Sequence, residues 1–466
     1  VDAGGGGAED AGRPVEAALA PAAPAVAEPA AVERKDEAGG TFTTYAPAKL
    51  RRRATPHPAK VVEAAAMAAV EPPDITYQGA IPQSVLDEKR LSGLQVESVL
   101  YAGQRHEQRL PNNERGGYFV GDGTGVGKGR IIAGIIADNW LQGRRRALWL
   151  SVSRDLQVAA QADLKDVAGK VAEIPVSAIN DYTIGSPITA DAGVLFGTYN
   201  TLISKSKGNT RLQQLIDWLG DDGVIVFDEA HKAKNALAAG RAEPTQTGQA
   251  VIDIQRRLPG ARVVYVSATG ATDVRNMAYM VRLGLWAPER AVTILGETVI
   301  EQVPEAVGSK YAFPGGFNEF LNEVESGGTG AKELVARDLK ALGMYGSRSI
   351  SFEGVSYRER IHDLTPDQRE MYDAAAKAWQ VVLQNIEAAV KVTGASRAAR
   401  TQAMKRFWAD HQRFFRQLTT ALKMPTVIAE VEDALKSGMS AIVTLKGTGE
   451  SKTAEQVAQA TAEGRE

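Results

Sequence analysis

The stretch Gly116-Gly-Tyr-Phe-Val-Gly-Asp-Gly-Thr-Gly-Val-Gly-Lys-Gly-Arg130 decides the fold. Tyr118 to Val120 predict a short strand, and the apolar run Ile131 to Ile136 predicts the helix that follows the glycines. Glycines leave backbone N–H groups free to surround an anion, and the N-terminus of a helix adds a partial positive charge. The stretch therefore predicts a phosphate-binding loop in which Lys128 reaches the β and γ phosphates of a nucleotide.

The loop departs from the general phosphate-loop pattern at two positions. Asp122 takes the place of the first glycine, and Gly129 takes the place of the Ser or Thr whose hydroxyl binds magnesium. The core of the pattern is kept, and the alternative is a glycine-rich turn before an ordinary helix. The candidate nucleotide contacts in the loop are Gly123, Thr124, Gly125, Val126, Gly127, Lys128, Gly129 and Arg130.

Composition sets limits on the class of protein. The 466 residues are 44% hydrophobic and long enough for two or three domains, with no run of about 18 apolar residues that predicts a membrane span. The absence of cysteine excludes disulfide scaffolds and cysteine-rich zinc sites and is compatible with an intracellular compartment. Lys plus Arg (54) nearly balance Asp plus Glu (56), so any nucleic-acid surface must be local.

The N-terminal part changes character along its length. Residues 1–55 predict a disordered tail rich in Ala and Pro, in which Arg51 to Arg53 either contact nucleic acid or are solvated. Residues 56–115 predict a helical extension, with helical spacing in Val61 to Val70 and in Leu91 to Tyr101. Gln95 is a candidate to read the adenine edge with its paired donor and acceptor, or else a surface glutamine.

Strands alternate with helices after the phosphate loop, which predicts a parallel sheet between helices with ligands at the carboxyl ends of the strands. The expected strands are Ala147 to Val152, Gly193 to Tyr199, Gly223 to Phe227 and Ala261 to Val266, and the expected helices are Asp155 to Val167 and Arg211 to Leu219.

Two of these strands end in candidate site residues. Asp228 and Glu229 follow a buried-looking strand, where paired carboxylates are costly unless a cation or a reaction uses them. We expect Asp228 to hold magnesium and Glu229 to polarise the attacking water, the alternative being an acidic helix N-terminus. Ser267-Ala268-Thr269 either cap the next helix or link the nucleotide state to a second ligand.

With these motifs in order, the chain resembles the helicase superfamily 2 motors and, within them, the strawberry notch family. The resemblance covers roughly residues 56 to 450. The strings that carry it are Leu91-Ser with Gln95, Gln104-Arg-His-Glu107, Gly121 to Arg130 with its Gly129, Asp228 to Asn235, Ser267 to Ala271, Arg275 to Met280, Gly343-Met-Tyr345, Ser351 to Val355 and His411 to Phe415.

The resemblance implies an α/β fold with a RecA-like P-loop lobe (residues 116–300), a helical insertion region (301–438) and the truncated start of a second RecA-like lobe (439–466). It implies ATP and Mg²⁺ as cofactors, catalytic roles for Lys128, Asp228 and Glu229, and coupling roles for His231 and residues 267–269. DNA, alternatively RNA, is the implied partner, together with chromatin or DNA-modification proteins in an intracellular setting. Because the second lobe supplies an arginine to the γ phosphate in such motors, a chain that only begins this lobe is expected to hydrolyse ATP weakly.

The region from 366 to 438 is the candidate nucleic-acid surface. Arg406, Arg413 and Arg416 lie among aromatic residues, and arginines with aromatics can neutralise phosphates and stack on unpaired bases. The aromatics also fall at the spacing of a buried helix face. Two functions follow for the whole chain: a helicase-like ATPase, or a nucleotide-regulated scaffold with little motor activity.

Overall fold

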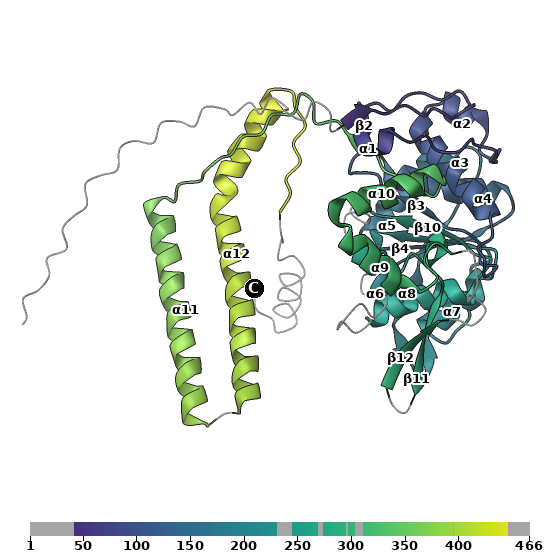
Figure 1. Cartoon of the computed structure of the whole chain (residues 1–466). Coiled ribbons are helices and arrows are strands. Elements are labelled where there is room, and N and C mark those ends of the chain that lie inside the picture. Colours follow the sequence, from purple (N-terminus) through teal and green to yellow (C-terminus); the bar gives the residue numbers. More distant parts are fainter. Residues whose placement is uncertain are drawn as a thin grey trace, which may run out of the picture. The chain divides into compact units, whose positions relative to one another are not determined.

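The computed structural model describes residues 42–230, 245–268, 274–294, 297–302, 311–394 and 396–445. They fall into two compact units that divide between residues 355 and 356 (Figure 1). The first unit contains the central sheet, and the second contains two long helices.

The central sheet has seven strands, all parallel, in the order β13-β3-β10-β9-β4-β6-β5. Helices connect the successive strands of this sheet, except that a 3₁₀ turn at Ile179–Asp181 lies between β5 and β6, and this confirms the predicted α/β fold with a parallel sheet between helices. The strands are β3 (Tyr118–Val120), β4 (Arg146–Ser151), β5 (Val176–Ala178), β6 (Gly193–Thr198), β9 (Val224–Asp228), β10 (Arg262–Val266) and β13 (Tyr345–Gly346).

Helices cover both faces of the sheet because successive strand residues point to opposite sides. Val224 and Val226 of β9 pack in the cluster that contains α3, α4 and α5, whereas Ile225 and Phe227 pack in the cluster on the other face. The first layer is α3 (Gly93–Glu107), α4 (Lys128–Leu141) and α5 (Leu156–Ala168). The second is α6 (Tyr199–Leu202), α7 (Arg211–Leu219), α8 (Gln246–Arg257), α9 (Phe317–Ser326) and α10 (Gly328–Ala341).

A second, three-stranded sheet is formed by β1 (Phe42–Thr44), β2 (Val61–Ala64) and β14 (Ser349–Ile350). It corrects one expectation. Val61 to Val70 is a strand followed by the short helix α1 (Ala65–Ala68), because the β-branched Val61 and Val62 pair with neighbouring strands. The paired strand β1 lies within the predicted tail, residues 1–55. Residues 1–41 lie outside the described residues.

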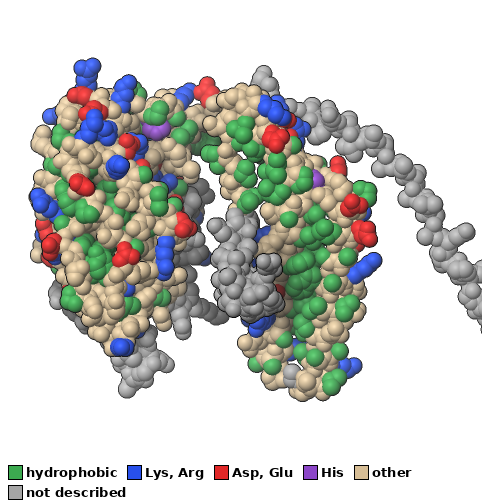
Figure 2. All heavy atoms as spheres, turned by 180° about the vertical axis from the view of Figure 1, so that it is seen from behind, with side chains coloured by type: hydrophobic (Ala, Val, Ile, Leu, Met, Phe, Trp, Pro, Cys, Tyr) green, Lys and Arg blue, Asp and Glu red, His purple; other side chains and the backbone are tan. Residues whose placement is uncertain are grey.

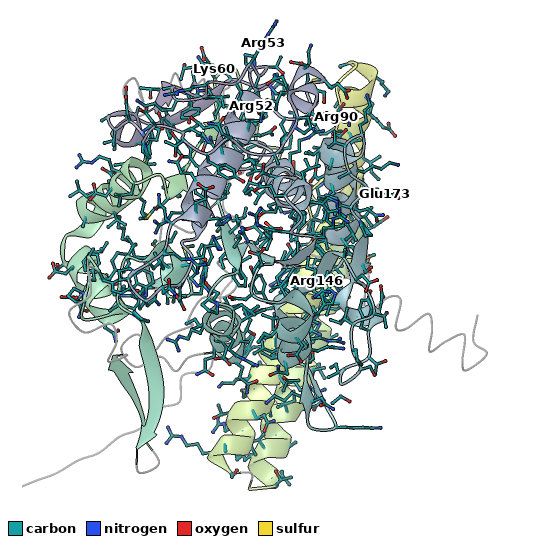
Figure 3. All side chains as sticks on the ribbon, turned by 90° about the vertical axis from the view of Figure 1, so that its right-hand side faces the viewer. Arg52, Arg53, Lys60, Arg90, Arg146 and Glu173 are labelled. Carbon is teal, nitrogen blue, oxygen red and sulfur yellow. The ribbon has the colours of Figure 1, made fainter. Side chains whose placement is uncertain are left out.

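The basic triplet belongs to this ordered N-terminal segment. Arg52 donates a hydrogen bond to the carbonyl of Ile81 at 2.7 Å, whereas Arg53 is exposed on the surface of the molecule (Figure 3). The remaining elements of the first unit are α2 (Gln83–Asp87), the 3₁₀ turns Ile179–Asp181, Val274–Met277 and Val281–Leu283, and the hairpins β7 (Lys205–Ser206) with β8 (Asn209–Thr210) and β11 (Glu289–Ile294) with β12 (Glu297–Gln302).

The second unit is an antiparallel pair of helices, α11 (Pro366–Val392) and α12 (Arg397–Lys436). They pack through aromatic rings, as between Trp379 and Phe407 at 5.5 Å. Residues 439–445, the described part of the implied start of a second lobe, pair with no strand among the described residues, and residues 446–466 lie outside the described ranges.

The structure also distributes the region 301–438 between the two units. β13 extends the central sheet beside β3, and α9 and α10 pack on that sheet, whereas α11 and α12 form their own unit. The limits of the expected domains stay predictions.

Candidate active site

Three candidate motifs lie at the ends of three adjacent strands. In the register of the sheet, Val266 of β10 is opposite both Val120 of β3 and Asp228 of β9. The phosphate loop begins at Gly121, so this loop, Ser267 and Asp228 share one edge of the sheet. Among the described residues, the structure thus brings together the phosphate loop, Asp228 and Ser267 at this edge.

The phosphate loop turns sharply into α4. Gly125 and Gly127 have φ angles of 90° and 88°, which glycine adopts without the cost that a side chain adds. Gly127 is the N-cap of α4 and offers no side chain to its first turn, so backbone N–H groups there remain available to an anion. The Lys128 ammonium lies over the loop, with Nζ 3.4 Å from the carbonyl of Gly123.

The segment that forms β13 and β14 runs beside the loop and supports it. The backbone N–H groups of Gly121 and Gly123 donate to the carbonyls of Gly346 and Arg348, both at 2.7 Å. This close approach explains three of the glycines, because a Cβ at each would meet a neighbouring side chain. The contacts would be Gly121 with Tyr345 at 2.2 Å, Gly123 with Ser349 at 2.9 Å and Gly125 with Ile350 at 2.4 Å.

Asp122, the departure from the general pattern, is fully buried and paired with Arg348. Arg348 donates through Nε and Nη2 to the two oxygens of Asp122, at 2.8 and 2.7 Å, and its backbone N–H adds a bond of 3.0 Å. Two parallel bonds fix both position and angle of the carboxylate. The base of the phosphate loop is therefore attached to the β13–β14 segment by an ion pair.

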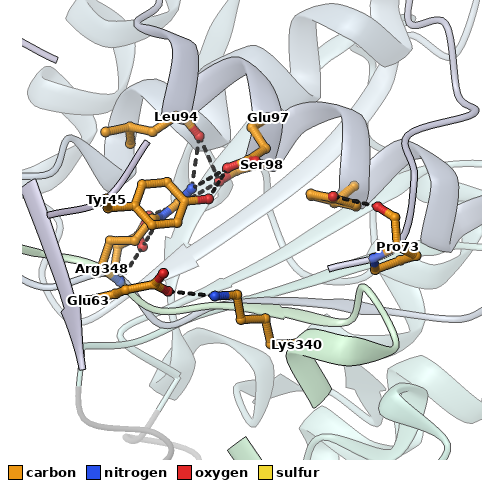
Figure 4. Close-up of polar contacts among 10 residues, drawn as sticks. Tyr45, Glu63, Pro73, Leu94, Glu97, Ser98, Lys340 and Arg348 are labelled. Carbon is orange, nitrogen blue, oxygen red and sulfur yellow. Dashed lines mark hydrogen bonds and ion pairs between the residues drawn. The ribbon is translucent and has the colours of Figure 1, made fainter. Parts of the chain in front are cut away.

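The same guanidinium contacts α3 (Figure 4). Its Nη1 donates to the Leu94 carbonyl at 3.1 Å and to Glu97 Oε2 at 3.2 Å, and Nη2 donates to the hydroxyl of Ser98. The hydroxyl of Tyr45 donates to Glu97, and the Tyr45 ring lies 5.3 Å from the guanidinium carbon. Burial raises the pKa of Glu97, although the charge of Arg348 opposes this effect. For Arg348, burial alone would lower the pKa, but the nearby Asp122, Tyr45 and Glu97 raise it well above its ordinary value.

Gln95 is buried beneath the phosphate loop. Its Oε1 accepts the Ser92 N–H at 2.9 Å at the start of α3, while Nε2 donates to the carbonyl of Val126 at 3.0 Å. Both ends of the Gln95 amide thus have a partner within the protein. These two bonds use one of the two amide N–H groups and one of the two lone pairs of the oxygen. The arrangement supports the loop directly, and contact with adenine stays a prediction.

Arg130 points away from the loop toward α5. Its Nη1 donates to the Arg90 carbonyl at 2.7 Å, and Nη2 forms an ion pair with Asp166. Of the other loop candidates, Val126 is buried, and Thr124 and Gly125 are exposed at the tip of the loop.

Asp228 is held in a defined orientation at the end of β9. Its Oδ2 accepts the Ser151 hydroxyl at 2.8 Å, Oδ1 accepts the Glu229 N–H at 3.0 Å, and its carbonyl accepts the Tyr199 hydroxyl at 2.8 Å. Burial raises the pKa of Asp228, and the charge of Glu229 raises it further. Such a carboxylate gains from a cation that offsets its desolvation.

Glu229 has a φ of 49°, in the left-handed region. This conformation is uncommon for residues with a side chain and costs on the order of 1–3 kcal/mol. Ser267 is buried, and its backbone N–H donates to the Val120 carbonyl at 3.0 Å, across the end of the sheet. Ala268 follows it at this edge, and His231 and Thr269 lie outside the described residues.

On α12, the three candidate arginines follow each other at spacings of seven and three residues, which places them on one side of the helix. Arg413 pairs with Asp410 at 3.4 Å. The aromatics mostly support the packing interpretation: Phe407 is buried, and Phe414 and Phe415 contact Trp379 and Tyr372 of α11. Trp408, in contrast, is 46% exposed, and Figure 2 shows hydrophobic side chains gathered on this unit.

Sequence reasoning missed Arg348, Ser151 and Tyr199, which act on the site from other elements. The only local signal for Arg348 was Asp122, a charge at a position where a glycine was expected.

Among the described residues, no group of three or more His, Cys, Asp or Glu is arranged to hold a metal. Magnesium bound with a nucleotide needs only one or two protein carboxylates besides phosphates and waters. The single carboxylate of Asp228 meets this requirement. No helix in the described ranges is long and apolar enough to cross a membrane.

Comparison with known proteins gives a family and relatives. A family model described as "P-loop containing NTP hydrolase pore-1" matches residues 56–306 and 305–374. The chain is 42% identical over 429 residues to "Protein strawberry notch homolog" of Caenorhabditis elegans, covering 89% of this chain and 22% of the relative. It is 41% identical over 439 residues to "Protein FORGETTER 1" of Arabidopsis thaliana, covering 91% and 32%.

Among solved structures, the Sulfolobus solfataricus SWI2/SNF2 ATPase core domain is similar with 14% identity and a TM-score of 0.35, over 79% of this chain and 65% of that chain. The chain spans between 22% and 33% of the length of the curated relatives it matches.

Proposed function

The chain belongs to the P-loop NTP hydrolase family of the strawberry notch proteins, and from that membership we propose that it is an ATP-dependent, helicase-like nucleic-acid motor. DNA is the proposed substrate and RNA the alternative, with chromatin or DNA-modification proteins as partners inside the cell. One observation carries the proposal: the phosphate loop, Asp228 and Ser267 lie at the ends of three adjacent parallel strands.

Each group at this edge has a proposed part in hydrolysis. Lys128 and the N-terminus of α4 bind the β and γ phosphates, and Asp228 holds the magnesium ion, which neutralises charge on the phosphates when bound. Glu229 orients and polarises the attacking water. Ser267, Ala268, Thr269 and His231 couple the nucleotide state to the nucleic acid.

The second candidate is a nucleotide-regulated scaffold in chromatin or DNA-modification complexes. The exposed hydrophobic side chains of α11 and α12, such as Val392 and Trp408, favour contact with another macromolecule. Retention of Lys128, Asp228 and Glu229 favours hydrolysis, because a scaffold has no need of two carboxylates at the end of a buried strand.

Steady-state ATP hydrolysis distinguishes the two functions. It is measured with and without single-stranded DNA, double-stranded DNA and RNA, on this chain and on a longer chain that carries a second lobe. Turnover that nucleic acid stimulates in the longer chain, and that Lys128→Ala abolishes together with ATP binding, supports the motor. ATP binding without turnover under every nucleic acid supports the scaffold, and undiminished ATP affinity of Lys128→Ala contradicts the phosphate-loop assignment.

A further inference from the structure

Gly129 leaves a place beside the phosphate loop that a carboxylate of α5 fills. The general phosphate loop has a Ser or Thr here, whose hydroxyl binds magnesium. A Cβ built on Gly129 would lie 2.1 Å from Oδ2 and 3.1 Å from the carboxyl carbon of Asp163. The Asp163 carboxylate therefore occupies the space in which that hydroxyl side chain begins.

The contacts of Asp163 within the protein do not account for a carboxylate at this position. It is half-buried, and no residue in the described ranges donates a hydrogen bond to its carboxylate. Burial raises its pKa, the charge of Arg130 lowers it and that of Asp166 raises it again. The Arg130 guanidinium itself is paired with Asp166, one turn further along α5. A partly desolvated carboxylate without a donor in the protein gains from a cation bound beside it.

A carboxylate can take the place of the hydroxyl as a ligand of Mg²⁺. A hydroxyl and a carboxylate both offer an oxygen to Mg²⁺, which prefers oxygen ligands and retains several waters. The full negative charge of a carboxylate attracts Mg²⁺ more strongly than the dipole of the hydroxyl that it replaces. Gly129 is required for the exchange, since any side chain at this position would displace the carboxylate.

We propose that Asp163 supplies the oxygen ligand that Gly129 lacks, and binds the nucleotide-associated Mg²⁺ directly or through a water. The proposal rests on the proposed function, because it needs the loop from Gly121 to Arg130 to bind a nucleotide. It assigns to α5 a role in metal binding that ordinary phosphate loops assign to the first turn of α4.

The test uses binding in the 466-residue chain. Calorimetry gives the affinity for the non-hydrolysable analogue AMP-PNP with Mg²⁺ and with EDTA, and Mn²⁺ binding in the presence of AMP-PNP is followed by its electron paramagnetic resonance signal. Asp163→Asn keeps the shape and removes the charge. We expect it to lower the gain in affinity from Mg²⁺ by on the order of tenfold, to weaken Mn²⁺ binding, and to leave the affinity in EDTA unchanged. Asp155→Asn is the matched control, an exposed carboxylate at the N-cap of the same helix.

A swap makes the test independent of whether the single variant folds well. Gly129→Ser alone is expected to weaken Mg²⁺-dependent binding, because its Cβ conflicts with Asp163. Gly129→Ser combined with Asp163→Ala restores an ordinary phosphate loop and should recover the dependence on Mg²⁺. An unchanged dependence in Asp163→Asn, an equal loss with and without metal, or a swap that recovers nothing overturns the role of Asp163. Failure of the unaltered chain to bind AMP-PNP at all would instead contradict the proposed function.

Discussion

Arg348 and Asp122 are separated by 226 residues in the sequence, yet their side chains form a buried ion pair with two bonds of 2.8 and 2.7 Å. The pair connects the base of the phosphate loop to the segment between β13 and β14. Glu97 and Ser98 complete the contacts of the guanidinium from α3. The position of the loop is thus fixed by two other parts of the chain, the segment between β13 and β14 and the helix α3.

Replacement of Arg348 should destabilise the first unit strongly. Arg348→Met leaves the carboxylates of Asp122 and Glu97 buried without their cation, and breaking a buried pair in this way costs about 3–5 kcal/mol. The free energy of unfolding from urea titration measures the loss. Arg337→Met is the control, because the Arg337 side chain is 41% exposed and its pair with Asp338, at 3.9 Å, is worth about 0–1 kcal/mol. Similar losses in the two variants would show that the buried pair adds little to stability.

Glu229→Gln should separate binding from turnover. The amide keeps the size of the side chain but cannot take a proton, so we expect ATP affinity by calorimetry to stay the same and turnover, in a chain with both lobes, to fall by about 10²–10⁴-fold. Glu173→Gln is the control, since Glu173 is exposed on the surface (Figure 3). Turnover that survives in Glu229→Gln removes this residue from the proposed mechanism.

Gln95→Ala distinguishes support of the loop from recognition of adenine. The variant loses the bonds to Val126 and to the Ser92 N–H, which are each worth about 1 kcal/mol of stability, and we expect the loop to bind phosphates less tightly. If Gln95 acts through the loop, the affinities for ATP, GTP and inorganic triphosphate weaken together. A loss confined to ATP would assign adenine recognition to Gln95 instead. Gln161→Ala, at an exposed position of α5, is expected to change none of the three.

The arginines of α12 are tested through the salt dependence of binding. Neutralising Arg406, Arg413 and Arg416 together should reduce the slope of log K against log salt for single-stranded DNA by about two, because each phosphate contact contributes about 0.7. Fluorescence anisotropy at several salt concentrations measures the slope. The matched control removes three charges from α11, at Arg369, Lys377 and Lys391. An equal change in both triple variants would mean that no specific surface exists on α12.

The sequence predicted the central sheet well because its signals are local. The strands β4, β6, β9 and β10 are mostly apolar runs of five or six residues, so they lie close to their expected places. Short elements at the margin were less predictable. Val61 to Val70 has a spacing that suits a helix, and pairing with β1 and β14 makes its first four residues a strand instead.

What the sequence by itself determined is the order of the motifs and the edge of the sheet at which they lie, because parallel strands present all their carboxyl ends on one side. The tertiary structure alone decided how the departures from the general loop are used. Asp122 is paired with Arg348, and Gly129 gives room to Asp163, by contacts between elements that no local pattern connects. The reason is physical: periodicity reports which face of an element is buried, whereas the partner of a buried charge depends on which distant element packs against that face.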